Sequence, residues 1–151
     1  MEFYIIQTIT GLIGSVAFAV LFGVCTRRLG WIAFGGGAGW VVYLVCRAGG
    51  YDMFVGLFMA SLFVAALSEV LARVLKTPVV LLLVPMLIPE IPGGDLYYTM
   101  YYLVQGRFQE FGDSSKQVLI EAGAIAMGII FASYIAKFVR SIWVHVLHRT
   151  A

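Results

Sequence analysis

Apolar residues occur along this chain in runs that are long enough to cross a lipid bilayer. Five such runs lie at about residues 3–26, 31–48, 53–72, 78–104 and 118–140, and the short stretches between them hold most of the charged residues. A helix that crosses a bilayer needs about 20 mostly apolar residues. The pattern predicts a single-domain, all-α integral membrane protein with about five transmembrane helices.

The fourth run is interrupted. Its segment PVVLLLVPMLIPEIPGG, residues 78–94, contains all four prolines of the chain and ends in Gly93 and Gly94. Proline lacks a backbone donor and disrupts the preceding helical turn. Broken backbone at membrane depth persists only against protein or a water-filled cavity. We therefore expect Pro89 to Gly94 to form a discontinuous element near a translocation path, as in many transporters; a merely kinked structural helix is the alternative.

Three glutamates lie inside or at the edge of apolar runs, namely Glu69, Glu90 and Glu121. A charge at the bilayer centre costs several kcal/mol, so such residues usually face a bundle interior or a cavity. Arg73 follows Glu69 by four residues, which brings opposite charges together on one helix face. The two form either a solvated interfacial pair or part of an ion or substrate site. Glu121 could simply be a first-turn acid favoured by the helix dipole.

The residues after the break suggest a ligand. Gly93 and Gly94 permit backbone geometries that other residues avoid, and Asp95 could cap a helix that begins at Leu96. The free N–H groups of that helix would suit a carboxylate or phosphate, so a small anionic or zwitterionic metabolite is predicted. Tyr97 begins an aromatic patch that either forms an interfacial belt or lines the pathway.

Small residues recur at every fourth position in three runs. This spacing keeps them on one helix face, where backbones can approach closely. The faces serve either internal packing or contact with another subunit, including a second copy of this chain. The residues are Gly11, Ser15, Ala19 and Gly23; Gly35 and Gly39; and Ala124, Gly128, Ala132 and Ala136.

The basic residues predict an orientation in the membrane. With five spans, seven of them share one side, and the positive-inside rule makes that side cytoplasmic. The N-terminus is then outside and the C-terminus in the cytoplasm. The seven are Arg27, Arg28, Arg73, Lys76, Lys137, Arg140 and Arg149.

Composition excludes several classes of protein. Hydrophobic residues form 62% of the chain and charged residues 12%, whereas a soluble domain carries about 25% charged residues. The mean hydropathy is +0.96. No metal-ligand spacing, phosphate loop or nucleophile–base constellation is visible, so we expect no enzyme, cofactor or metal site. The net charge of +2 carries little meaning by itself, and no nucleic-acid partner is expected.

The stretch SEVLARVLKTPVVLLLVPMLIPEIPGGDLYYTMYYLVQG, residues 68–106, resembles the threonine/serine exporter family, in particular the small stand-alone component that corresponds to its C-terminal membrane half. The likeness extends to Gly39-Trp40, to Val42-Tyr43 and to GAIAMGI in the fifth run. Glu90 departs from the family pattern. The resemblance implies a bacterial inner-membrane protein that works with a larger exporter-type subunit and exports threonine and serine, or a dicarboxylate such as succinate.

Together these observations predict one half of a proton- or gradient-driven exporter of small polar metabolites. Substrate would bind near Glu90 and Tyr97, between this subunit and its partner, and Glu69 with Arg73 would form a gating or coupling pair. A non-transporting assembly or regulatory subunit is the main alternative, and an integral-membrane enzyme ranks third.

Overall fold

The computed structural model describes the backbone of residues 2–149 and the side chains of residues 5–139 and 141. Within residues 2–149 the protein is helical and contains no strand, which confirms the predicted all-α class. The elements are α1 (Glu2–Leu21), α2 (Thr26–Ala48), α3 (Met53–Val74), α4 (Val80–Leu87), the short 3₁₀ helix η1 (Ile88–Glu90), α5 (Gly93–Val104) and α6 (Phe108–Arg149).

Length and composition mark three described helices as able to cross a membrane, namely α2, α3 and α6. The segments Val80–Glu90 and Gly93–Val104 make a fourth span if they are taken together, although they are bent by 62°. The apolar part of α1, Ile5–Leu21, is shorter. The protein is therefore a multi-pass membrane protein with three to four candidate spans, and the predicted number of five is not confirmed.

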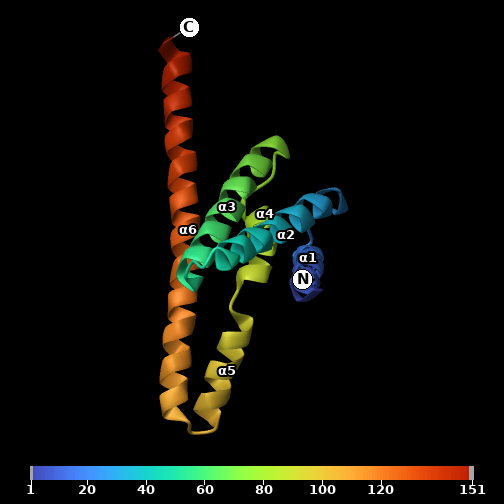
Figure 1. Ribbon diagram of the computed structural model, residues 1–151. Coiled ribbons are helices and arrows are strands. Elements are labelled where there is room, and N and C mark those ends of the chain that lie inside the picture. Colours follow the sequence, from blue (N-terminus) through green and yellow to red (C-terminus); the bar gives the residue numbers. More distant parts are fainter. Residues whose placement is uncertain (1, 150–151) are drawn as a thin grey trace.

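The helices form a compact group from which one hairpin projects (Figure 1). The helix α3 packs along α6, while α2 packs on both α1 and α3. The short α4 lies against α1, α2 and α3. By contrast, α5 packs mainly on α6, and α5 with the first part of α6 extends away from the other helices as a hairpin (Figure 1).

Small residues allow close helix contacts in this group. A Cβ added at Gly36 would lie 3.0 Å from Cβ of Ser15 and 3.3 Å from the carbonyl oxygen of Met86, where α2 crosses α1 and α4. One added at Gly128 would lie 2.8 Å from backbone atoms of Phe58 and Leu62 in α3. At these positions the small-residue faces therefore serve internal packing.

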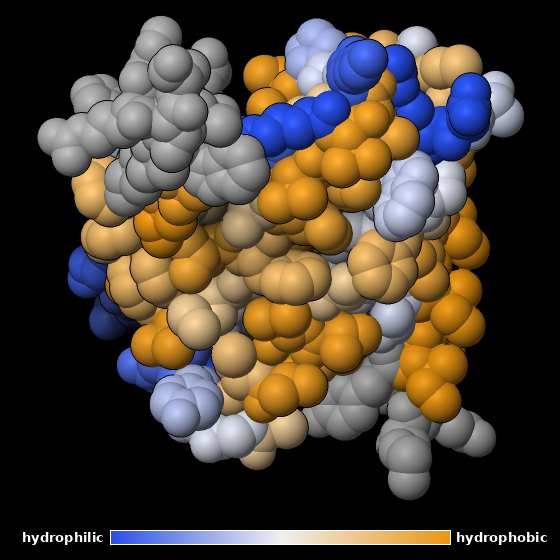
Figure 2. Space-filling model, turned by 90° about the horizontal axis from the view of Figure 1, so that it is seen from above, coloured by the Kyte–Doolittle hydropathy of each residue, from blue (hydrophilic) through white to orange (hydrophobic). Residues whose placement is uncertain are grey.

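The outside of the molecule is largely apolar, as a bilayer requires. Figure 2 shows a mostly hydrophobic face with hydrophilic residues gathered toward its edges. Large side chains such as Phe34, Val45 and Ile130 are more than half exposed. Side chains fully buried inside include Ile32, Val64, Leu82 and Met86. The apolar surface thus faces lipid, while a small apolar core holds the helices together.

The first predicted boundary is wrong. The helix α1 ends at Leu21 rather than near residue 26, and α2 already begins at Thr26 rather than at residue 31. The reason is Gly23, whose φ of +68° lets the chain turn at the end of α1; this backbone region favours glycine. Gly23 is therefore part of a turn and does not extend the small-residue face of α1.

The predicted start of the last helix is also wrong. The polar residues 108–117 were expected to precede a helix beginning at about residue 118, but α6 already begins at Phe108. Gly106, with φ +70°, turns the chain so that α5 and α6 run side by side. The hydroxyl oxygens of Thr99 and Ser114 lie 2.6 Å apart across this pair. Pairing with α5 thus stabilises residues 108–117 as part of a helix, which their polarity alone does not predict.

Candidate functional site

The break between α4 and α5 has a local cause in the prolines. Pro89 lies inside η1, and Pro92 stands directly before the first residue of α5. Neither has an N–H group to continue a helix. The intervening amides find short-range acceptors instead, since Gly93 N donates to the carbonyl of Ile91 at 2.7 Å. The predicted interruption is therefore present, and it changes the chain direction by 62°.

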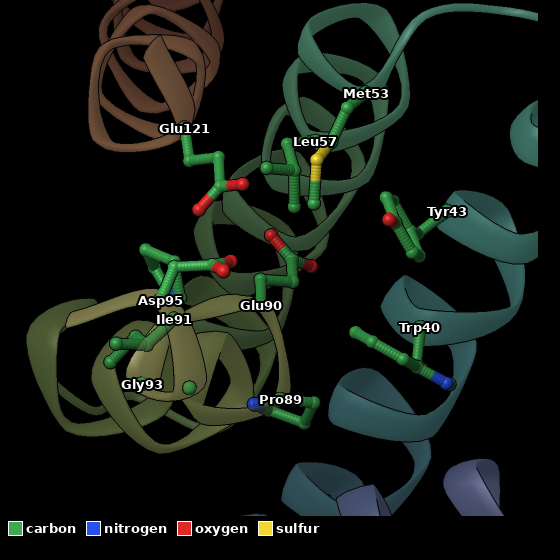
Figure 3. Close-up of a pocket in the computed structure, with 12 residues that line it drawn as sticks. Trp40, Tyr43, Met53, Leu57, Pro89, Glu90, Ile91, Gly93, Asp95 and Glu121 are labelled. Atoms are coloured by element: carbon green, nitrogen blue, oxygen red, sulfur yellow. The ribbon is translucent and has the colours of Figure 1, made fainter. Parts of the chain in front are cut away.

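A cavity of about 150 Å³ lies at this break (Figure 3). Four parts of the molecule line it: α2, α3, the broken segment with the start of α5, and α6. The lining residues are Trp40, Tyr43, Met53, Leu57, Pro89, Glu90, Ile91, Pro92, Gly93, Gly94, Asp95 and Glu121. The structure thus brings together five of the predicted site residues, from Pro89 to Gly94.

Glu90 is the most unusual residue of the cavity. Its side chain is only 2% exposed, and neither carboxyl oxygen has a hydrogen-bond partner among the described residues. It fits because α2 presents a glycine here: a Cβ added at Gly39 would lie 2.6 Å from Oε1 of Glu90. A buried carboxylate without a partner is costly, so the site must neutralise it with a proton or a cation.

Glu121 is fully buried on the opposite side of the cavity. Its Oε1 accepts a hydrogen bond from Nε2 of Gln117 at 2.9 Å, while its Oε2 has no partner within the described part of the chain. The interpretation as a first-turn acid is wrong, because α6 begins at Phe108 and Glu121 lies well inside it. Glu121 is therefore a member of the site.

Asp95 completes a group of three acids. It was predicted to cap a helix beginning at Leu96, but α5 begins at Gly93, its N-cap is Pro92, and no side chain caps it. In Figure 3 the carboxyl groups of Glu90, Asp95 and Glu121 turn toward a common space. No lysine, arginine or histidine lines this space in the region that the structure describes. The cavity therefore favours a positively charged group. The exception is the position beside the N-terminal amides of α5, which favour a negatively charged group.

The other predicted residues lie elsewhere. Arg73 Nη2 and Glu69 Oε2 form the expected i,i+4 ion pair at 3.3 Å. Both line a separate groove of about 350 Å³ between α3 and α6, which is roughly 18 Å along α3 from Leu57 by the helical rise. Tyr97 is 66% exposed and does not line the cavity. The ion pair and Tyr97 are thus separate from the acidic site.

Several residues that line the cavity or contact its lining were not singled out from the sequence as site residues. Trp40 and Tyr43 pack against each other with ring centroids 5.0 Å apart, and both belong to the short motifs of α2 to which the family resemblance extends. Gln117 donates to Glu121 and also lies 2.9 Å from the sulfur of Met53. The spacing of Gln117 and Glu121 by four residues was a usable signal, because it puts two polar groups on one face of an apolar helix.

Comparison with known families agrees with the sequence pattern. The family model described as "Threonine/Serine exporter, ThrE" matches residues 7–135. This range includes the broken segment and all the cavity residues. Among curated proteins and among solved structures, nothing matches the chain.

Proposed function

This chain belongs to the threonine/serine exporter family, and from that premise we propose that it is a subunit of an exporter for threonine and serine or for a dicarboxylate such as succinate. The observation that carries this proposal is the cavity at the break between η1 and α5. Discontinuous helices of transporters commonly bind substrate at such a break.

The chemistry of the cavity supports a small polar substrate. The backbone N–H groups at the start of α5 can receive a carboxylate, and Gly93 and Gly94 leave open space beside them, because a Cβ at either glycine would meet no described atom within 4 Å. The carboxyl groups of Glu90, Asp95 and Glu121 can receive an ammonium group. A zwitterion would use both sides of the cavity, whereas a dicarboxylate would require these acids to be neutral.

We also propose that the chain works with a larger subunit of the same family in a bacterial inner membrane. The support is the exposed surface of α5, where Tyr97, Tyr98, Met100 and Val104 are all more than half exposed. A partner that packs on α5 would enclose the cavity from the open side of the hairpin, and rocking between the two halves would alternate access. The faces of small residues would also allow a second copy of this chain to associate.

The proposed orientation has the N-terminus outside and the C-terminus in the cytoplasm. It rests on the basic residues, of which Arg140 and Arg149 have side chains outside the described part. In this orientation the Glu69–Arg73 pair lies toward the cytoplasmic end of α3 and would act as a gating or coupling pair. Cysteine accessibility at the two ends of α3 would test the orientation directly.

The test is efflux of preloaded, labelled threonine, serine and succinate from cells that lack their own exporters. It is run with this chain, with its partner, and with both. Efflux that requires both chains is expected, and the accelerated solute identifies the substrate. Absence of efflux for all three solutes, despite a stable complex in the membrane, would refute the exporter assignment.

A non-transporting assembly subunit is the second candidate, and the exposed face of α5 favours it. Gly93→Leu separates the two, because its side chain would project into the open space beside the α5 amides. An exporter subunit should lose efflux while the complex remains. Gly30→Leu is the matched control, since Gly30 is exposed on α2 and a Cβ there meets nothing described within 4 Å. Unchanged efflux in Gly93→Leu would support the assembly role.

A further inference from the structure

We propose that Glu90 and Glu121 are proton-binding residues of this protein, which hold their protons while their side chains are buried and exchange them with water when the hairpin moves. The threonine/serine assignment specifies no coupling ion and no residue that would carry one. The role in coupling rests on the proposed function, whereas proton binding itself can be tested on this chain alone.

The first argument is burial without compensation. Glu90 is 2% exposed with both carboxyl oxygens unpartnered in the described chain, and Glu121 is fully buried with Oε2 unpartnered. An ionised carboxylate in such a place needs a counter-charge or several donors. Glu121 has one donor, Gln117, and Glu90 has none among the described residues. The neutral acid is the form that these surroundings accommodate.

The second argument is the charge of the neighbouring groups on every packed element. From α2 the titratable neighbour is Tyr43, and Arg47 lies one turn further with Nη1 donating to the carbonyl of Tyr51 at 3.1 Å. The titratable neighbour from α5 is Asp95. The contributions of α3 to the cavity, Met53 and Leu57, are uncharged, and α1 meets the segment through Gly11 against Pro89.

These neighbours oppose ionisation of both glutamates at once. Asp95 lines the same cavity as both of them, and like charges in one site disfavour a further negative charge. No cation from the described part of the chain lines the cavity to offset them. A proton on each glutamate therefore removes both the desolvation cost and the mutual repulsion.

The fold also provides a route to exchange. α5 packs mainly on α6 and joins the α1–α4 group through Ile91 and Pro92, whereas α6 also packs along α3. α5 and the start of α6 can therefore move while the contacts between α3 and the rest of α6 persist. This motion would expose to water the side chains of Glu90 and Glu121, which are buried in this structure. Each acid then transfers its proton to water, giving hydronium and a carboxylate, and the N-terminal amides of α5 help to stabilise that negative charge. Reprotonation returns the closed state.

Infrared difference spectroscopy of this chain in lipid nanodiscs tests the proton-binding step. At neutral pH the wild-type spectrum should contain the carbonyl stretch of protonated carboxylic acids in apolar surroundings, and an alkaline titration should remove it. Glu90→Gln and Glu121→Gln should each lose a part of this band. The control Glu110→Gln should leave it unchanged, because Glu110 is paired with Arg107 and exposed. A neutral-pH spectrum without the band, or a band that both cavity variants retain, would overturn the proposal.

Transport by the complex tests coupling separately. In proteoliposomes, Glu90→Gln and Glu121→Gln should lose export driven by a pH gradient while they retain exchange of labelled for unlabelled substrate without a gradient. Wild-type gradient-driven export in both variants would overturn the coupling role. If the wild-type complex exports nothing, the proposed function fails, and the infrared result still decides whether the glutamates bind protons.

Discussion

Replacement of Gly39 by alanine should destabilise the fold at the cavity. Gly39 lies where α2 crosses α3 and η1, and an added Cβ would lie 2.6 Å from Oε1 of Glu90 and even closer to Cγ2 of Val64. Both neighbours are buried, with Val64 at 0% and Glu90 at 2% exposure. Neither side chain can therefore yield by swinging into solvent, so the helices must separate or the carboxyl must move.

The expected magnitude follows from two opposing effects. Overpacking of a well-packed interior costs about 1–3 kcal/mol, and two buried neighbours place this site in the upper half of that range. Alanine improves on glycine in a helix by about 1 kcal/mol in water. The net expectation for Gly39→Ala is a loss of about 1–2 kcal/mol in the free energy of unfolding.

Gly30→Ala is the matched control, because it makes the same change in the same helix. Gly30 is exposed, and a Cβ there meets no described atom within 4 Å. Its stability should remain unchanged or rise by up to about 1 kcal/mol. Reversible unfolding by SDS in mixed micelles measures both variants, and tryptophan fluorescence is a suitable signal since Trp40 lines the cavity.

A double-mutant cycle identifies the cause of the loss. Val64→Ala removes the methyl group that crowds the new Cβ, so it should partly restore the stability of Gly39→Ala. The coupling free energy between the two sites should exceed about 0.5 kcal/mol in the favourable direction. If Gly39→Ala is as stable as Gly30→Ala, or if the two changes are additive, the packing argument is refuted.

Three further variants probe other contacts by the same unfolding assay. Gly128→Ala should cost about 1–3 kcal/mol, because its Cβ would meet backbone atoms of α3 at 2.8 Å; no loss would contradict the close α3–α6 approach. Thr99→Val removes the hydroxyl that lies 2.6 Å from Ser114 and should cost about 0.6–1.7 kcal/mol, with faster amide exchange in α5; unchanged exchange would count against this pairing. Leu82→Ala should cost about 2–5 kcal/mol, because Leu82 is fully buried in the core, and a value below 1 kcal/mol would contradict that burial.

Local features of the chain were predictable because they depend on neighbours in sequence. The all-helical membrane class follows from the length and spacing of the apolar runs, and the break follows from Pro89 and Pro92, which lack amide donors. The Glu69–Arg73 ion pair forms because residues four apart in a helix face each other. In each case one element contains all the information.

The acidic cavity was decided by tertiary structure. Glu90 and Glu121 belong to different elements, and they meet because Gly106 turns the chain and α5 pairs with α6. That pairing also carries α6 back to Phe108, so that Glu121 lies mid-helix instead of at a helix start. The role of Gly39 is likewise visible only where α2 crosses η1. Sequence by itself determined the membrane class, the position of the break and the residue types available there, because these are properties of single segments. Which acids share one cavity depends on how distant segments pack, and only the tertiary structure decided it.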